Sequence, residues 1–161
     1  MEFRPIGRIH SPFKTPEEMP VQPAGAAGVV GTIELDPALA EGLVDLDGFS
    51  HLIVLYHFHR AAPARLTVTP FLDPAPHGVF ATRAPTRPNP IGLSILALKG
   101  IAGAVLTVEG VDILDGTPLL DIKPYVPHFD RPAGEIRTGW LESSAGSVNS
   151  TRADNRFVPE R

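Results

Sequence analysis

Hydrophobic residues in this chain come in short runs, and turn-forming residues separate one run from the next. Within the runs, apolar and polar residues alternate or β-branched residues dominate, which is typical of strands that bury one face. Eight segments are predicted as strands on this basis: Ile6–His10, Ala27–Leu35, His51–His59, Leu66–Val68, Val79–Thr82, Gly92–Lys99, Val105–Leu114 and Pro118–Ile122. The segment Gly134–Leu141 fits either a final strand or a short helix.

The pattern contains one helix signal and several loop signals. Asp36 can cap a first helical turn, Pro37 suits the first helical position, and Gly42 can end the helix. The glycines of Gly100–Gly103 favour a hairpin turn between the two strands that flank it. Loops are predicted over 13–24 and 84–90, which hold three prolines each, and over Tyr125–Asp130.

Composition turns these elements into a fold class. The chain has 161 residues, of which 18 are proline and 15 glycine. Proline fixes φ and lacks an N–H donor, so we expect neither long helices nor the helical crossovers of a parallel sheet. The prediction is an all-β fold, a small single β-barrel over residues 1–142 with one short helix. Residues 143–161 are predicted as a polar, irregular C-terminal tail with the composition of a mobile segment.

Charge and cysteine content exclude several classes of protein. The absence of cysteine excludes disulfides, thiolate metal sites and cysteine nucleophiles. No apolar run approaches the ~20 residues that span a bilayer, and the first residues lack the apolar region of a secretory signal, so we expect a cytoplasmic protein without a membrane partner. The net charge of −4 is less basic than non-specific phosphate binding requires, so any nucleic-acid contact must come from a local cluster. A DNA partner is not expected.

Familiar nucleotide-binding and hydrolase motifs are missing from the chain. No GxGxxG follows a predicted strand, and no GxxxxGK[ST], GxSxG or HExxH motif occurs. A dinucleotide-binding fold, a P-loop NTPase, an α/β-hydrolase and a zinc protease of the HExxH type are therefore not supported.

The segment RAPTRPNPIG holds two arginines and an asparagine among three prolines. Prolines restrict the free loop, so Arg83 and Arg87 can be presented with a smaller entropic cost. Guanidinium groups suit bidentate recognition of a carboxylate or phosphate, and Asn89 adds an amide donor and acceptor. The alternative is a rigid connector whose arginines are only solvated.

The segment DILDGTPLLDIKPY carries three aspartates, a lysine and a tyrosine. Asp121 and Lys123 are two residues apart and share a strand face, where they can form an ion pair or bind the two charged groups of an amino-acid-like ligand. Asp115-Gly116 reads as a turn. Asp121 interrupts an apolar run, and a buried carboxylate needs a partner.

Three histidines, His51, His57 and His59, share one face of a predicted strand. Two of them with an aspartate could hold a metal ion, and a histidine-based metal protein is therefore one alternative. No fourth ligand stands at a recognisable spacing, so the prediction is that no metal is bound.

The blocks GVFATRAPTRPNPIGLS and DILDGTPLLDIKPYVP, together with the N-terminal block IGRIHSPFK…PVQP and the strand segment FSHLIVLYHFHR, closely resemble the TsaA/TrmO-like family. The resemblance covers roughly residues 3–130, in four ordered blocks. It implies a compact β-barrel that binds S-adenosylmethionine and forms a homodimer. It also implies a tRNA-modifying enzyme, an S-adenosylmethionine-dependent methyltransferase that methylates N6 of threonylcarbamoyladenosine next to the anticodon of tRNA. Longer members continue into a C-terminal region that is short here.

The resemblance also implies roles for individual positions. Cofactor binding is implied for Pro20, Val21, Gln22, His59, Arg60, Arg83, Leu93, Glu109, Gly110, Val111 and Asp112. The chemistry of the transfer, and not the resemblance, makes Asp121 and Tyr125, with Asp112 next, the candidates for removing the acceptor's proton. Arg87, Asn89 and Lys123 are the candidates for substrate binding. The alternative is an S-adenosylmethionine-binding module or regulator without transfer activity. An intact RxxxRPNP loop favours the enzyme, and the short C-terminus favours the alternative.

Overall fold

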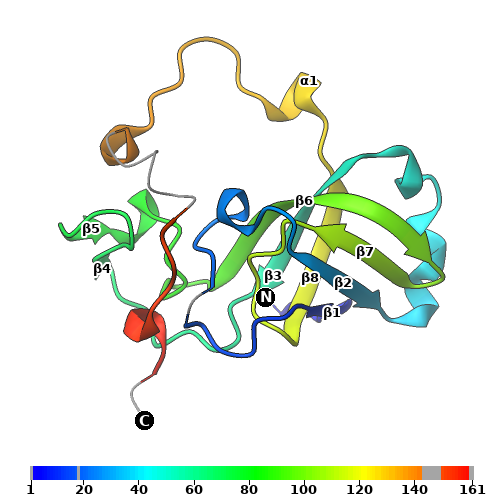
Figure 1. Cartoon of the computed structure of the whole chain (residues 1–161), viewed down its shortest axis with the longest axis horizontal. Coiled ribbons are helices and arrows are strands. Elements are labelled where there is room, and N and C mark those ends of the chain that lie inside the picture. The colour runs from blue at the N-terminus through cyan, green and yellow to red at the C-terminus, as the bar shows by residue number, and fades with distance from the viewer. Residues whose placement is uncertain (1, 18, 143–149, 160–161) are drawn as a thin grey trace.

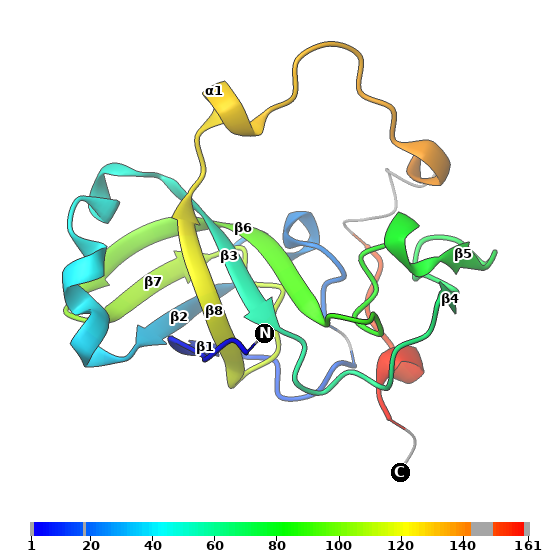
Figure 2. The same cartoon turned by 180° about the vertical axis from the view of Figure 1, so that it is seen from behind.

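A computed structural model describes residues 2–17, 19–142 and 150–159. Six antiparallel strands close a barrel in the order β1-β2-β7-β6-β3-β8. Figures 1 and 2 show this barrel from its two sides, with the smaller β4–β5 lobe beside one end. The barrel strands are β1 (Gly7–His10), β2 (Val30–Leu35), β3 (His51–His57), β6 (Ile91–Ala102), β7 (Val105–Glu109) and β8 (Thr117–Pro124). The predicted small all-β barrel is confirmed.

Alternation along the strands builds the barrel core. On β3, Leu52, Val54 and Tyr56 are buried, whereas His51 and His57 are exposed. The side chains that fill the barrel are almost all aliphatic: Ile9, Ile33, Leu35, Leu52, Val54, Leu96, Leu106, Val108 and Leu119. Because a strand turns successive side chains to opposite faces, every second position of these strands had to be apolar.

The strand β3 lies at the centre of the arrangement that carries the site. It pairs with β6 from His51↔Ala97 to His57↔Ile91, and with β8 from Leu52↔Pro124 to Tyr56↔Leu119. The register with β8 shifts between Leu55 and Tyr56, as at a β-bulge. The end of β3 leads directly into the second lobe.

Short helical turns replace long helices throughout. The predicted helix after Asp36 is the 3₁₀ turn η2 (Pro37–Leu43), and Asp36 Oδ1 accepts from the Ala38 N–H at 3.0 Å as the cap. The other 3₁₀ turns are η1 (Pro23–Ala26), η3 (Leu46–Gly48), η4 (Val79–Ala81), η5 (Gly139–Leu141) and η7 (Asn155–Phe157). The hairpin between β6 and β7 turns at Gly103, whose φ of 59° is left-handed. No helix in the described ranges is long and apolar enough to cross a membrane.

Three predictions of local structure were wrong or incomplete. Val79–Thr82 was predicted as a strand but forms η4, because the Thr82 hydroxyl and N–H both bond back to the Val79 carbonyl. Tyr125–Asp130 was predicted as a loop but contains the one-turn helix α1 (Pro127–Asp130), whose Asp130 carboxylate accepts from the Val126 N–H at 2.6 Å. The strand predicted over Val105–Leu114 stops at Glu109.

A small second lobe holds the segment between β3 and β6. The strands β4 (Thr67–Val68) and β5 (His77–Gly78) pair within it, and η4 follows. Its core contains Val68, Val79, Ala84 and Phe157, with Phe71 packed against them. Phe157 comes from the chain's other end, drawn red in Figure 1, so residues 150–159 pack against this lobe. Residues 143–149 of the predicted tail lie outside the described residues.

Candidate functional site

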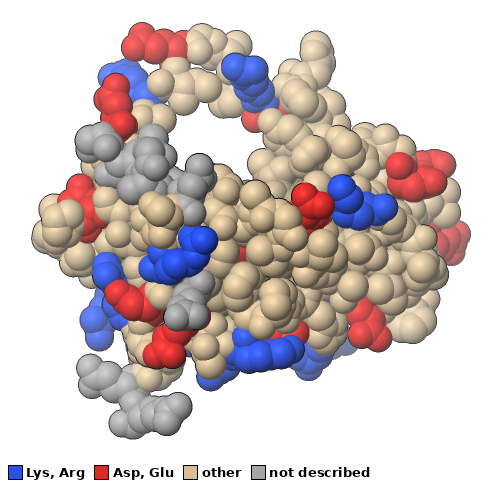
Figure 3. Space-filling view, viewed as in Figure 1, with Lys and Arg blue, Asp and Glu red and all other residues tan. Residues whose placement is uncertain are grey.

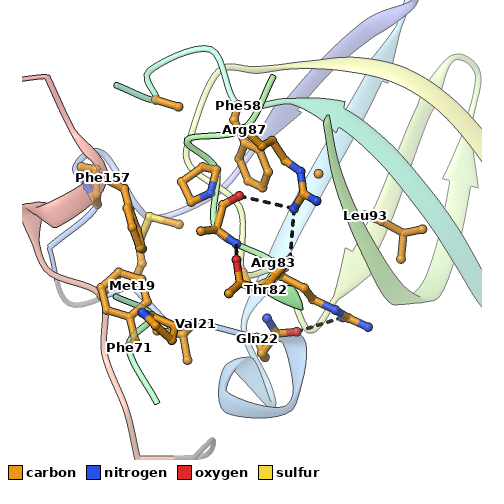
Figure 4. Close-up of a pocket in the computed structure, with 18 of the residues that line it drawn as sticks. Met19, Val21, Gln22, Phe58, Phe71, Thr82, Arg83, Arg87, Leu93 and Phe157 are labelled. Carbon is orange, nitrogen blue, oxygen red and sulfur yellow. Dashed lines mark hydrogen bonds between the residues drawn. The ribbon is translucent and has the colours of Figure 1, made fainter. Parts of the chain in front are cut away.

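A cavity of about 1100 Å³ opens where the barrel meets the second lobe. Its walls come from the segments before β2, the end of β3, the proline-rich loop before β6, the segment after β7, and the C-terminal part of the chain. Figure 4 shows two kinds of surface in it, with Arg83 and Gln22 together and Met19, Phe71 and Phe157 grouped apart. The cavity therefore offers a polar end and an apolar end.

Arg83 projects into the cavity from the loop that the prolines stiffen. Its Nη1 donates to Gln22 Oε1 at 3.0 Å, and both side chains are drawn in Figure 4. Gln22 stands just before η1, which Pro23 opens, so the glutamine is held at the end of a short rigid turn. The remaining guanidinium donors of Arg83 are available for a carboxylate or phosphate.

Arg87 has a different environment in the same loop. Its Nη1 donates to the Thr82 carbonyl at 3.2 Å and to the Ala84 carbonyl at 3.4 Å. Thr82 in turn accepts from the Ala84 N–H through its hydroxyl at 3.2 Å. Arg87 thus braces the loop that presents Arg83, while both Arg87 and Asn89 line the cavity.

Asp112 is the carboxylate at the polar end of the cavity. It follows Gly110, whose φ of 87° turns the chain inward, and Val111, which is fully buried. Burial raises the pKa of Asp112 to about 6, although a hydrogen bond from Ser94 and the nearby Arg83 guanidinium oppose the shift. The Tyr56 hydroxyl next to Ser94 has a pKa raised by burial and by Asp112, so it stays protonated.

His59 and Arg60 stand at the wall of the cavity where the chain leaves β3. Burial, followed by the charge of Arg60, lowers the pKa of His59 below its usual value, so the imidazole is neutral at pH 7. His59 Nδ1 lies 3.4 Å from the Thr117 hydroxyl. Arg60 donates to the Lys14 carbonyl at 3.3 Å. Both residues line the cavity.

Ten of the residues assigned to cofactor or substrate binding line this one cavity. They are Pro20, Val21, Gln22, His59, Arg60, Arg83, Arg87, Asn89, Leu93 and Asp112. The remaining assigned residues stand elsewhere. Glu109 forms an ion pair with Lys99 at 3.3 Å, Gly110 lies in the turn, and the Val111 side chain packs in the barrel core.

Asp121 and Lys123 form the ion pair that the sequence allowed, with Nζ and Oδ2 2.7 Å apart. Both project from β8, partly exposed, and neither lines the cavity. Tyr125 follows β8 and donates its backbone N–H to the His51 carbonyl. The two residues assigned to proton removal are thus outside the cavity of a single chain.

The sequence analysis missed Tyr56, Ser94 and Trp140. Tyr56 and Trp140 line the cavity, and Ser94 lies behind its wall in contact with both Tyr56 and Asp112. Position 94 carried a signal that was overlooked: a serine occupies an inward position of β6, in phase with the buried Leu96. A polar residue in a core register needs a partner, and that partner is Asp112.

The histidines do not assemble into a metal centre. His51 and His57 are exposed on β3, while His59 has left the strand. Within the described ranges, no three His, Cys, Asp or Glu side chains gather closely enough to hold a metal ion.

Comparisons with known proteins match most of the chain. A family model described as the tRNA-methyltransferase O N-terminal domain matches residues 8–131. A probable S-adenosyl-L-methionine-binding protein of Pyrococcus abyssi is 53% identical over 155 residues, covering 96% of this chain and 84% of the relative. A mouse tRNA (adenine(37)-N6)-methyltransferase is 36% identical over 135 residues, covering 80% of this chain and 31% of the mouse protein.

Solved structures that resemble this chain carry the name of the same family. The crystal structure of TrmO from Pseudomonas aeruginosa superposes with a TM-score of 0.72 at 41% identity, covering 87% of this chain and 62% of the neighbour. The chain therefore spans less than two thirds of the length of that solved structure. The family model runs from β1 to just beyond α1, so it includes the barrel and the cavity walls up to the segment after β7, but not the C-terminal wall.

Proposed function

Because the chain belongs to the family of the tRNA-methyltransferase O N-terminal domain, we propose that it is an S-adenosylmethionine-dependent methyltransferase that acts on tRNA. The acceptor is N6 of threonylcarbamoyladenosine next to the anticodon. The mouse relative carries a name that specifies N6 of adenine 37 in tRNA, and this supports the position. A tRNA substrate supports a cytoplasmic location for the protein.

The observation that carries the proposal is the polar end of the cavity. Arg83, held by Gln22, offers guanidinium donors to the cofactor's carboxylate, and Asp112 offers an acceptor to its donors. A volume of about 1100 Å³ leaves room for an acceptor base besides the cofactor. Relatives that are named for binding S-adenosyl-L-methionine support the same ligand.

Methyl transfer from a sulfonium is an in-line displacement that needs positioning more than acid chemistry. The methyl carbon forms a bond to the acceptor nitrogen, and the electrons of the broken carbon–sulfur bond stay on sulfur. The nitrogen of a ureido-type group is a poor nucleophile while it keeps its proton, so a residue that accepts this proton assists the reaction. Asp121 and Tyr125 are proposed for that role.

A second copy of the chain would bring Asp121 and Tyr125 to a cavity that they do not reach within one chain. The outward face of β3 and β6 is apolar, with Ile91, Leu93 and Ile95 each 38–47% exposed. Leu55 on β3 pairs with Leu93 on one side and with Asp121 on the other, and Leu93 also lines the cavity. We propose a homodimer across this face, in which Asp121 and Tyr125 of one copy stand at the cavity of the other.

Binding of the tRNA rests on local contacts. On the face shown in Figure 3, Lys and Arg side chains are dispersed among Asp and Glu and do not merge into one basic field. Arg87, Asn89 and Lys123 are therefore the proposed substrate contacts, at the cavity and at the dimer face. Few phosphate contacts release few counterions, so the affinity for tRNA should fall only shallowly with salt.

A second candidate function is cofactor binding without transfer. It is favoured by the 53% identical Pyrococcus relative, whose name specifies binding of S-adenosyl-L-methionine and no reaction. The two functions share the cavity and differ in whether a methyl group leaves the cofactor.

The test is to incubate the protein with methyl-labelled S-adenosylmethionine and total tRNA from its own source, followed by nucleoside analysis. Label in N6-methylated threonylcarbamoyladenosine establishes the proposed reaction. tRNA that lacks the threonylcarbamoyl group is the matched control and should stay unlabelled. Cofactor that binds stoichiometrically while no nucleoside gains label refutes the methyltransferase and establishes the second candidate.

A further inference from the structure

Three polar side chains from three different segments form a hydrogen-bonded chain at the cavity wall. Ser94 Oγ donates to Asp112 Oδ1 at 2.7 Å, and the Tyr56 and Ser94 hydroxyl oxygens are 3.1 Å apart. A serine hydroxyl has one proton, so a Ser94 that donates to Asp112 must accept from Tyr56. The chain therefore runs in one direction, from Tyr56 through Ser94 to the carboxylate.

Strand pairing fixes the position of this chain. Tyr56 pairs with Gly92 across β3 and β6, and Ser94 stands two residues further along β6, opposite Val54. The Tyr56 ring lies flat against Gly92: a Cβ there would come within 2.2 Å of a ring carbon. The Phe58 ring packs edge to face against the Tyr56 ring, with ring centroids 5.4 Å apart. The tyrosine ring has little freedom to leave this place.

The barrel does not need these polar groups to close. Ser94 is 1% exposed, in an inward row that continues with the aliphatic Leu96. A buried hydroxyl costs about 1–3 kcal/mol unless it is hydrogen-bonded, whereas an aliphatic residue would add packing at no such cost. Both ends of the network, Tyr56 and Asp112, line the cavity, whereas Ser94 between them does not. Asp112 is the end that carries a carboxylate.

We propose that Tyr56 and Ser94 are positioning residues for Asp112: they engage Oδ1 inside the protein and so present Oδ2 to the cavity as the acceptor for an O–H or N–H donor of bound S-adenosylmethionine. Throughout the described part of the chain, Ser94 is the one side chain that bonds to Asp112. This inference rests on the proposed cofactor, and it adds two residues that the family resemblance did not assign.

The groups around the carboxylate determine the pKa of Asp112, through which the network can be measured. The groups that face Asp112 are the Tyr56 hydroxyl and the Arg83 guanidinium, besides Ser94. Burial raises the pKa of Asp112 to about 6, and the hydrogen bond from Ser94 lowers it. Removing that hydrogen bond must therefore raise the pKa further, so the carboxylate would protonate nearer neutral pH.

The experiment compares Ser94→Ala, Ser94→Thr and Tyr56→Phe with the full-length parent. The carboxyl carbon of Asp112 is titrated by NMR without ligand, and S-adenosylmethionine binding is measured by calorimetry between about pH 5 and pH 8. Ser50→Ala is the matched control, because Ser50 is exposed just before β3 and its hydroxyl bonds locally to His51. Thermal unfolding of each variant checks that the barrel is intact.

In Ser94→Ala we expect the midpoint of the Asp112 titration to rise by about one pH unit, and cofactor affinity near pH 7 to fall about tenfold. Tyr56→Phe should move both quantities in the same direction by less. Ser94→Thr keeps the hydroxyl and should restore both. In an Asp112→Asn background, Ser94→Ala should add almost nothing, since both changes act through one carboxylate.

Several results overturn the inference. A folded Ser94→Ala protein with the parent's titration midpoint and affinity shows that Ser94 does not position Asp112. Additive losses in the double variant show that the two residues act separately, and a loss of thermal stability alone shows a structural role. If the unaltered protein binds no S-adenosylmethionine, the proposed function itself fails, and that result is distinct from these.

Discussion

Arg83 combines exposure with a fixed position, which makes it a clean residue to test. Its guanidinium is tied to Gln22 in a proline-stiffened loop and contributes little to the core. We expect Arg83→Ala to leave the unfolding free energy unchanged and to weaken S-adenosylmethionine binding at least tenfold, because a charge-assisted hydrogen bond is lost. Calorimetry measures this, with the exposed Arg65→Ala as control. Full affinity in Arg83→Ala would refute its role.

Asp112 should oppose folding at neutral pH. Its folded-state pKa, about 6, lies above the ordinary 3.8, so the folded chain binds the proton more tightly than the unfolded chain. Protonation therefore favours folding: the contribution appears as pH falls from about 6 towards 4 and is lost as pH rises through that window. The difference of about 2 pKa units corresponds to about 3 kcal/mol.

We expect Asp112→Asn to be more stable than the parent at pH 7.5 or above by up to about 3 kcal/mol, and the gap to close below about pH 4. Urea unfolding across this range measures the difference, and comparison with the parent cancels the opposite effect of Asp115 and Asp154, whose pKa values are lowered. A variant that is equally stable at all pH values would contradict the assigned burial of the carboxylate.

The Tyr56 ring packs against Gly92 and leaves no room for a side chain at that position. A methyl group at this position meets carbons of the Tyr56 ring at 2.2–2.8 Å, so the ring or the strand must shift. Overpacking of this kind costs about 1–3 kcal/mol, and we expect that loss in urea unfolding of Gly92→Ala. Gly100→Ala on the same strand is the control, since nothing lies within 4 Å of its Cβ. Equal stability of the two variants would contradict the packing described.

At the scale of elements, the C-terminal segment organises loops that line the cavity. Ala153 donates to the Met19 carbonyl at 2.8 Å, and the Phe157 carbonyl accepts from the Ala62 N–H at 2.9 Å. Phe157 packs edge to face on Phe71, with centroids 5.1 Å apart, and the Arg156 guanidinium lies 4.7 Å from the centre of the Phe71 ring. Residues 150–159 thus connect segments that the chain places far apart.

We therefore expect Phe157→Ala to destabilise the second lobe by about 3–5 kcal/mol while the barrel stays folded. Limited proteolysis should cut the segments before β2 and after β3 faster, and cofactor affinity should fall because the loop with Gln22 loses its support. Phe129→Ala is the control, since Phe129 is 73% exposed. If Phe157→Ala resists proteolysis and binds like the parent, the C-terminal segment does not support the site.

At the scale of the whole molecule, the apolar outward face of β3 and β6 is the proposed dimer interface. Ile53 and Ile95 pair across these strands on that face, with Ile95 38% exposed. We expect Ile95→Lys to convert a dimer into a monomer, because it places an unpaired charge in the buried centre of the interface. Light scattering after size exclusion measures the mass. Val44→Lys, at a 70% exposed position, should remain dimeric; a monomeric parent would refute the proposed interface.

The fold could be predicted because barrel strands follow a local rule. Alternation in Leu52–Tyr56 and in β6 indicates which face is buried, and the spacing of proline and glycine excludes long helices. Two of the errors fell on single turns. η4 and α1 are each held by one side chain that bonds to the backbone, Thr82 and Asp130, and such a turn overrides the propensity of three or four residues.

The sequence by itself determined the barrel strands, the stiff loop that carries Arg83 and, through family resemblance, the residues that gather around the cavity. Only the tertiary structure decided which polar groups meet. Gln22 and Arg83 are 61 residues apart, and Ser94 and Asp112 are 18 apart on separate segments. The barrel's closure and the return of Phe157 bring such groups together. Periodicity indicates which face of a strand is buried, but it does not indicate which side chains of two separate segments lie within hydrogen-bond distance.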